Sequence, residues 1–214
     1  MRKKSRETRE QILGAALKLF NKKGVESVTI RAIAAEAGIS HGNLLYHFAG
    51  VESIVLALHA KLRSAAVSLN EDVKAMPEAL PALVYSIERG FPILYAYRFF
   101  MINLNDLVRR FPEVRRTLRK AESLRKRMYS EAIQAGVKQG SLRRENYPGE
   151  YEHLIDRIRI FSDYWPASAE IYDSGSPDKI IRKYAHLFVS MIYPYVTDKG
   201  KVRLDFPRSF SVDP

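Results

Sequence analysis

Hydrophobic residues recur at intervals of three and four along almost the whole chain, and no convincing strand-like alternation accompanies them. This periodicity predicts an all-α protein. The expected helices cover about residues 6–23, 52–74, 150–172 and 177–196, with a further long helix from Glu113 to near Gly136–Gly140. Two shorter helices are expected within residues 29–48. Proline-containing pairs such as Met76-Pro77 mark the breaks between helices.

The segment 29–48 carries the most informative pattern. Its first helix is expected to be capped by Thr29 and to pack through Ile30, Ile33, Ala34 and Ala37, and its second to pack through Leu44, Leu45 and Phe48. Gly38 lies between the two and tolerates the positive φ that a tight turn needs. The second helix leaves a small polar surface made by Ser40, His41, Gly42, Asn43, Tyr46 and His47. An ordinary buried hairpin has no use for such a face, whereas a DNA-binding helix-turn-helix places one in the major groove.

Charge is unevenly distributed along the 214 residues, whose formal net charge is +11. Residues 1–48 carry nine Lys or Arg and four Asp or Glu. Residues 109–127 carry nine Lys or Arg and two Glu. Such an excess favours polyanionic partners, which include DNA, RNA and acidic membranes. For residues 109–127 a solvated helix face is the preferred interpretation, and an accessory polyanion or partner surface is the alternative.

Several other classes of function find no support in the residues. The chain has no cysteine, which excludes disulfides and cysteine-ligated zinc. The five histidines show no metal-ligand spacing, and neither a glycine-rich phosphate loop nor a Gly-x-Ser-x-Gly elbow occurs, so no metal, cofactor or enzymatic activity is expected. No apolar run suits a secretory signal or a bilayer span. We therefore expect a cytoplasmic protein without a membrane partner.

The N-terminal pattern resembles that of the TetR family of bacterial transcriptional regulators over about residues 8–58. The matching motifs are Ile-Leu-x-Ala-Ala-x-x-Leu-Phe at 12–20, Gly24, Thr29, Ile33-Ala34, Ala37-Gly38-Ile39 and Leu-Tyr-x-Phe at 45–48. The resemblance implies a helix-turn-helix DNA-binding domain over residues 1–51 and a helical regulatory and dimerisation domain over residues 52–196. Residues 197–214 are polar and are expected to form a loose tail. Val51 departs from the family pattern, which usually has a phosphate-binding lysine there.

Side-chain chemistry and the resemblance together assign DNA contacts to Thr29, Arg31, Ser40, His41, Gly42, Asn43, Leu45, Tyr46 and His47. His41 and Asn43 suit base edges, while Tyr46 and His47 resemble the phosphate-contacting pair of the family. Each assignment has an alternative. Arg31 can be a solvated surface residue rather than a guanine contact, Asn43 a phosphate donor, and His47 a charge at a helix C-terminus.

The resemblance also implies a homodimer on a palindromic operator, an effector pocket among the middle helices, and repression as the commoner mode. Apolar residues on several sides of the last two helices fit a dimer interface, for which the candidates are Ile155, Ile158, Ile181, Phe188 and Ile192. Burial inside one subunit is the alternative. The candidate pocket residues, which suit an apolar or aromatic effector, are Phe91, Tyr95, Phe99, Phe100, Asn103, Phe161 and Trp165. Aromatic residues at helical spacing otherwise belong to a core.

The leading hypothesis is thus a ligand-responsive DNA-binding repressor. A DNA-binding adaptor, whose helical domain binds a protein rather than a small molecule, is the main competitor. Nonspecific packaging of DNA is a third possibility, and it predicts no preference for a palindrome.

Overall fold

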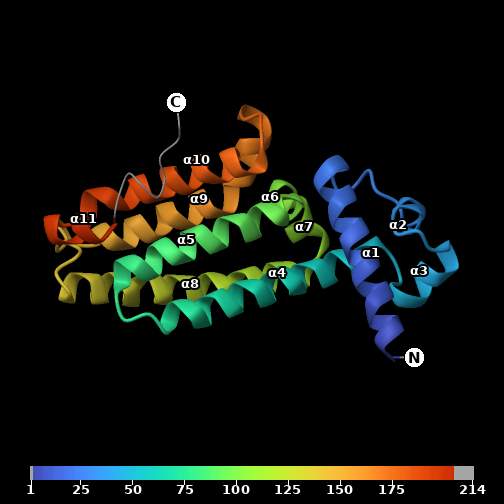
Figure 1. The fold of residues 1–214 in the computed structure, drawn as a ribbon, viewed down its shortest axis with the longest axis horizontal. Coiled ribbons are helices and arrows are strands. Elements are labelled where there is room, and N and C mark those ends of the chain that lie inside the picture. Colours follow the sequence, from blue (N-terminus) through green and yellow to red (C-terminus); the bar gives the residue numbers. More distant parts are fainter. Residues whose placement is uncertain (1, 205–214) are drawn as a thin grey trace. The chain divides into compact units, whose positions relative to one another are not determined.

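The computed structural model describes residues 2–204, which form helices and no named strand over that range (Figure 1). The predicted all-α class is confirmed. Residue contacts divide the chain into two compact units. Unit 1 contains residues 2–65 and Tyr97–Val114, and unit 2 contains Ala66–Ala96 and residues 115–204. This division differs from the expected boundary at residue 51, because a segment from the middle of the chain packs with the N-terminal helices.

Unit 1 is built from whole helices and parts of helices. They are α1 (Arg2–Lys23), α2 (Ile30–Glu36), α3 (His41–His47), the first part of α4 (Val51–Lys74), α6 (Arg98–Ile102), α7 (Leu104–Arg110) and the first three residues of α8 (Pro112–Lys138). Helix α1 ends before Gly24, whose φ of +75° closes the helix in the left-handed region. Short α6 and α7 follow the break after Ala96, where the apolar pattern of the sequence indicated no separate helices.

The core of unit 1 joins α1, α4 and α6. The rings of Phe20 and Phe99 lie 5.2 Å apart, and the backbone N–H of Phe99 donates to Asn21 Oδ1 over 3.0 Å. His59 is buried and stacks on Phe100 with ring centroids 4.8 Å apart and planes 2° from parallel. Burial lowers the pKa of His59, helped by the positive charge of Arg63 and opposed by Glu113. The neutral imidazole therefore serves as a core aromatic.

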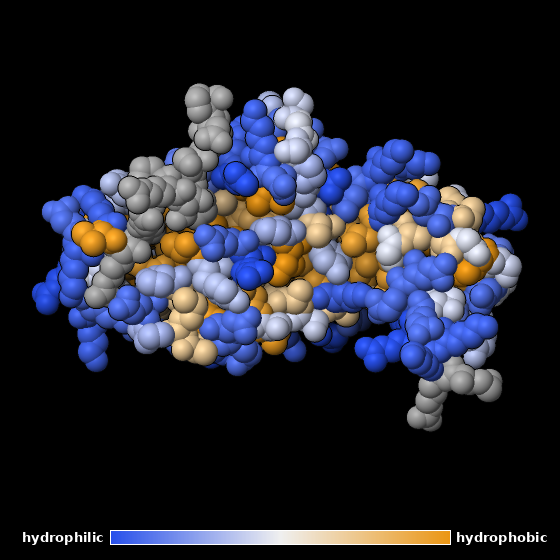
Figure 2. All heavy atoms as spheres, in the orientation of Figure 1, coloured by the Kyte–Doolittle hydropathy of each residue, from blue (hydrophilic) through white to orange (hydrophobic). Residues whose placement is uncertain are grey.

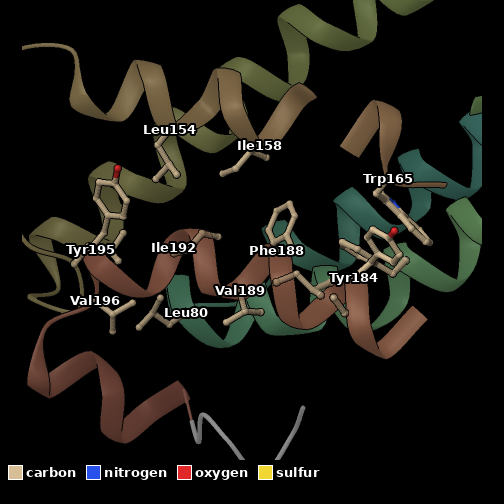
Figure 3. Close-up of a cluster of buried hydrophobic side chains, with 14 of the residues drawn as sticks. Leu80, Leu154, Ile158, Trp165, Tyr184, Phe188, Val189, Ile192, Tyr195 and Val196 are labelled. Carbon is tan, nitrogen blue, oxygen red and sulfur yellow. The ribbon is translucent and has the colours of Figure 1, made fainter. Parts of the chain in front are cut away.

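Unit 2 contains the remaining helices. They are the second part of α4, α5 (Ala79–Ala96), α8 (Pro112–Lys138) from residue 115 onward, α9 (Glu150–Tyr172), α10 (Pro177–Ile192), a 3-10 turn η1 (Tyr193–Tyr195) and α11 (Asp198–Leu204). Helix α10 packs on both α5 and α9, which gives one continuous apolar cluster (Figure 3). Trp165 lies at the centre of its aromatic part, stacked on Phe91 at 5.2 Å and tilted against Tyr184 at 5.0 Å.

A partly buried ion pair fixes the connection between α8 and α9. The Arg143 guanidinium donates to both carboxylate oxygens of Glu150, over 2.8 and 2.7 Å, and the backbone N–H of Asn146 donates to Oε2 over 2.7 Å. The side chain of Glu150 is only 7% exposed. These bonds to Arg143 and Asn146 lower the pKa of Glu150 to about 2. The carboxylate therefore stays charged in a site where an unpaired charge would be costly.

The expected loose tail has to be corrected, because residues 198–204 form helix α11. Thr197 caps this helix by accepting the backbone N–H of Gly200 over 3.1 Å, and α11 packs on α5. Gly200 is buried so closely that an added Cβ would lie 2.3 Å from the backbone oxygen of Ser141. The polar sequence and the glycine resemble a loop, but the glycine permits close packing. Residues 205–214 lie outside the described part of the chain.

Hydrophilic residues cover much of the face shown in Figure 2, with hydrophobic side chains visible between them. None of the helices within residues 2–204 combines the length and apolar character needed to cross a membrane.

Glu150→Gln is expected to destabilise the protein at neutral pH, because Arg143 loses its bidentate carboxylate. The folded-state pKa of about 2 lies below the ordinary value of 4.5, so the charged group stabilises the fold above about pH 4.5. That stabilisation is lost as the pH falls toward about 2, and the difference between parent and variant should shrink over the same range. Denaturant unfolding at a series of pH values measures it. Glu152→Gln, at an exposed position of the same helix, should follow the parent.

Candidate nucleic-acid interface

Two capped helices and a glycine turn form the predicted helix-turn-helix. Thr29 caps α2 by accepting the N–H of Ala32 over 3.2 Å, as predicted, and Ser40 caps α3 by accepting the N–H of Asn43 over 3.1 Å. Gly38 has a φ of +64°, which confirms the expected left-handed turn. Because both caps use hydroxyl oxygens as acceptors, each hydroxyl hydrogen remains available to a partner outside the protein.

One side of helix α3 packs against the rest of unit 1. Leu44 is fully buried and Phe48, the C-cap residue, is 3% exposed. Leu45 was expected to pack beside them, but 43% of it is exposed, so it belongs to the outer surface. Seven residues are too few for a stable isolated helix, and α3 therefore depends on this burial and on its caps.

The opposite side of α3 is an exposed and mostly polar surface. Tyr46 is 82% exposed, and His47 packs edge-on against its ring with centroids 5.1 Å apart. The structure brings the predicted contact residues of this helix together on the surface, with all exposed except His47, which is partly buried; they are Ser40, His41, Gly42, Asn43, Leu45, Tyr46 and His47. Thr29 and Arg31 are exposed on α2, at its start. Most of these groups are small or planar and can approach a groove closely.

Contacts between distant residues orient the two helices, and the sequence pattern did not reveal them. Arg9 donates to the backbone oxygen of His47 over 3.0 Å, and its guanidinium lies 4.1 Å from the ring centroid of Phe48. Gln11 donates to the backbone oxygen of Ala37 over 2.7 Å. Both contacts satisfy carbonyls at helix C-termini, which lack partners inside the helix. Arg9 and His47 are 38 residues apart, so no local periodicity could have signalled their contact.

Helix α2 is also tied to α1 by charge. Lys18 and Glu36 form an ion pair with 2.6 Å between Nζ and Oε1. The hydrogen bond and positive charge of Lys18 lower the pKa of Glu36. The pair lies largely in solvent, so its contribution to stability is small.

The N-terminus of α4 provides another set of donors. The helix begins at Val51, where the family usually has lysine, and Ser53 Oγ lies 3.3 Å from the backbone nitrogen of Gly50. Backbone N–H groups of a first helical turn can bind phosphate without a charged side chain. The start of α4 can therefore offer backbone donors to an anion although the lysine is absent.

The predicted pocket residues are divided between the two units. Phe99 and Phe100 are 1% exposed in the core of unit 1, and Asn103 belongs to the same unit. Phe91, Tyr95, Phe161 and Trp165 belong to the aromatic cluster of unit 2. A separate cavity of about 40 Å³ in unit 2 is lined by Ala79, Leu80, Leu83, Tyr129, Ala132, Ile133, Leu142, Tyr151, Leu154, Ile158, Ile192 and Tyr195. Hydrophobic spacing alone could not distinguish cavity walls from filled core.

The predicted dimer residues also need correction. Ile155, Ile158, Phe188 and Ile192 are 2–6% exposed within a single chain, and Ile181 packs partly buried against the same core. These side chains are therefore covered within their own chain and are not free to contact a second copy. Exposed large hydrophobic side chains of α9 and α10 lie at other positions, namely Ile160, Tyr164, Ile171, Tyr172 and Leu187.

An exposed polar helix that is capped and follows a capped helix and a tight turn has the arrangement of a DNA-binding helix-turn-helix. Residues 12–58 match the family model described as "Bacterial regulatory proteins, tetR family", and residues 64–204 match the model described as "Bacterial transcriptional repressor". The second match alone covers more than half of the chain. The chain therefore belongs to the TetR family. It is a DNA-binding transcriptional regulator, a non-enzymatic class of protein.

Individual relatives agree with this assignment. The HTH-type transcriptional regulator HbdR of Aromatoleum sp. (strain CIB) is 29% identical over 213 aligned residues, which cover 95% of this chain and 87% of HbdR. A TetR-family regulator of Marinobacter aquaeolei VT8 has the same fold, with a TM-score of 0.82 and 22% identity over 94% of this chain and 97% of its own. The regulator FadR of Bacillus subtilis, solved in complex with stearoyl-CoA, has a TM-score of 0.61 and 18% identity over 88% and 97%.

Alanine at Gly38 and at Gly42 should change stability in opposite directions. An added Cβ meets nothing within 4 Å at either position, so only the backbone conformation decides the effect. Gly38→Ala should cost about 1–2 kcal/mol because of its positive φ, whereas Gly42→Ala, inside α3, should stabilise by about 0.5–1 kcal/mol. Urea unfolding followed by circular dichroism measures both. Equal destabilisation by the two variants would contradict this account of the turn.

Proposed function

We propose that this regulator binds a palindromic operator as a homodimer, with α3 of each subunit in the major groove, and represses transcription until an apolar effector binds. The observation that carries the proposal is the exposed polar surface of α3, opposite a fully buried Leu44. A twofold dimer would place the two recognition helices about 34–36 Å apart, one turn of DNA. Nonspecific packaging would need no such surface, because phosphate contacts alone would suffice.

Side chains along α3 divide between base edges and phosphates in this proposal. His41 and Asn43, in the first turn, offer donors and acceptors to bases, and Gly42 lets the backbone approach the groove. Leu45, now known to point outward, suits a thymine methyl group. Tyr46, which is 82% exposed, suits a phosphate.

Residues outside α3 complete the proposed contact surface. Thr29 and Ser40 can each donate a hydroxyl hydrogen to phosphate while capping their helices. Arg31 lies exposed on the first turn of α2 and can reach a guanine, and His47 can assist Tyr46 at a phosphate. The start of α4 offers backbone N–H groups, and the exposed Lys3, Lys4 and Arg6 of α1 can supply the charge missing at Val51.

A homodimer is supported by the outer side of α9. Ile160, Tyr164 and Ile171 are 51%, 46% and 71% exposed, and their spacing of four and seven residues places them on one side of the helix. Leu187 adds an exposed apolar side chain on α10. Such a row on two neighbouring helices suits an isologous contact with a second copy of the chain.

Regulation by a small molecule is supported by two features of unit 2. The cavity of about 40 Å³ has an apolar lining, and the indole N–H of Trp165 is buried with no hydrogen-bond partner among the described residues. Drug-sized ligands need about 300–1,000 Å³, so an effector must enlarge the cavity. Because the enlarged cavity belongs to a different conformation, binding of the effector would favour that conformation. An adaptor would need no cavity. Operator affinity measured with and without apolar metabolites separates the two functions.

Tyr46→Ala is expected to lower affinity for all duplexes, whereas His41→Ala should change which sequence is preferred, with about 1–3 kcal/mol of discrimination at the contacted base pair. The measurement is selection of bound duplexes from a random pool, followed by affinities for a panel of the selected sites. Tyr172→Ala removes an equally exposed tyrosine from α9 and serves as the control. Selection of no palindrome by the parent protein would refute operator recognition, and parallel losses in both variants would refute the division of roles.

Ile160→Asp and Leu187→Asp should each weaken the dimer about tenfold or more, because a charge would be buried in an apolar interface. Sedimentation over a range of protein concentrations measures the dissociation constant. Val67→Asp, at a half-exposed position of α4, should leave it unchanged. A parent protein that sediments as a monomer at all concentrations would contradict the proposed dimer.

A further inference from the structure

The outward side of α8 carries an uninterrupted group of positive charges. With about 100° between successive helical residues, six basic residues fall within one arc opposite the buried side of the helix. We call them the α8 basic face: Arg115, Arg116, Arg119, Lys120, Lys126 and Arg127, all exposed. Ser123 is the other residue of this arc, and no carboxylate of α8 lies within it between residues 115 and 127.

Neighbouring helices do not neutralise this face. Arg125 lies on the flank of α8, where it pairs with Asp163 at 3.2 Å and Glu122 at 3.3 Å, and Arg159 also binds Glu122. By contrast, no described carboxylate lies within 4.0 Å of the charged groups of five members of the face, which are Arg115, Arg119, Lys120, Lys126 and Arg127. Carboxylates of α8 and α9 therefore neutralise the flank and leave the outward side positive.

The residue types of the face indicate which kind of polyanion it can bind. It contains no apolar or aromatic side chain, and an interfacial helix needs such residues to enter a membrane. A stable protein interface likewise needs an apolar centre with aromatic anchors. Four of the six residues are arginines, whose guanidinium groups bind phosphate oxygens in pairs. The face thus suits a phosphate backbone that requires no apolar contact.

Charge spacing also matches a nucleic acid. From Arg115 to Arg127 the helix rises about 18 Å, which corresponds to about five phosphates along one strand of a duplex. We propose that the α8 basic face is a second, sequence-independent binding surface for the backbone of duplex DNA. It is distinct from α3 and does not require operator recognition. Its contacts would add affinity and salt dependence without adding sequence information.

The test compares two triple variants of the full chain that remove the same charge. Arg119→Gln, Lys120→Gln and Arg127→Gln together alter the face, while Lys138→Gln, Lys179→Gln and Arg182→Gln remove exposed charges elsewhere in unit 2. Binding to a long mixed-sequence duplex is measured over a series of salt concentrations. The face variant should lower the slope of log affinity against log salt by about 2–3, and the control variant by less than about 1.

Further arms separate this proposal from operator recognition. In a Tyr46→Ala background the three face substitutions should reduce the salt slope by the same amount. They should also leave unchanged the ratio of the affinities for selected and mixed-sequence duplexes. A failure of operator selection would leave this result intact. Equal effects of the two triple variants would overturn the proposal. So would tighter face-dependent binding to polyglutamate or to phosphatidylserine vesicles, which would assign the face to an acidic protein or to a membrane.

Discussion

The burial of Leu44 and Phe48 is the constraint on which the DNA-binding surface depends. Helix α3 has only seven residues, and intrinsic propensity cannot hold so short a segment in helical form. Its direction is set by these two side chains, by the Ser40 cap at one end and by Arg9 at the other. Apart from Ser40, which also caps the helix, the recognition residues of α3 can therefore be small and polar without having to hold the helix in place.

Unit 1 contains a second segment of the chain, residues 97–114, which the sequence pattern did not predict. They leave α5, place Phe99 and Phe100 against α1 and α4, and then lead into α8. The segment is thus joined at both ends to helices of unit 2 while its aromatic side chains pack in the core of unit 1. The same residues are therefore packed in unit 1 and covalently continuous with unit 2.

The sequence predicted those features that depend on neighbouring residues. Helical periodicity, the Thr29 cap, the glycine turn and the polar surface of α3 all follow from spacings of a few positions, and the structure agrees with each. The sequence did not predict features that depend on contacts beyond the neighbouring residues. Nothing near Glu150 indicates that Arg143 will bind it bidentately, and nothing near Ile158 tells whether its partner belongs to the same chain. Amphipathic patterns identify which side of a helix is buried, but they do not identify the surface that covers it.

The tight contact between Gly200 and the backbone of Ser141 has a practical consequence. Leu80 and Val196 lie beside the same glycine, so α11 acts as a lid on the end of the apolar cluster. A chain shortened to residue 196 would leave this end of the cluster open to water and prone to aggregation. Affinity tags, reporters and fusion partners should accordingly be attached beyond residue 204, even though the amino acids of α11 look dispensable.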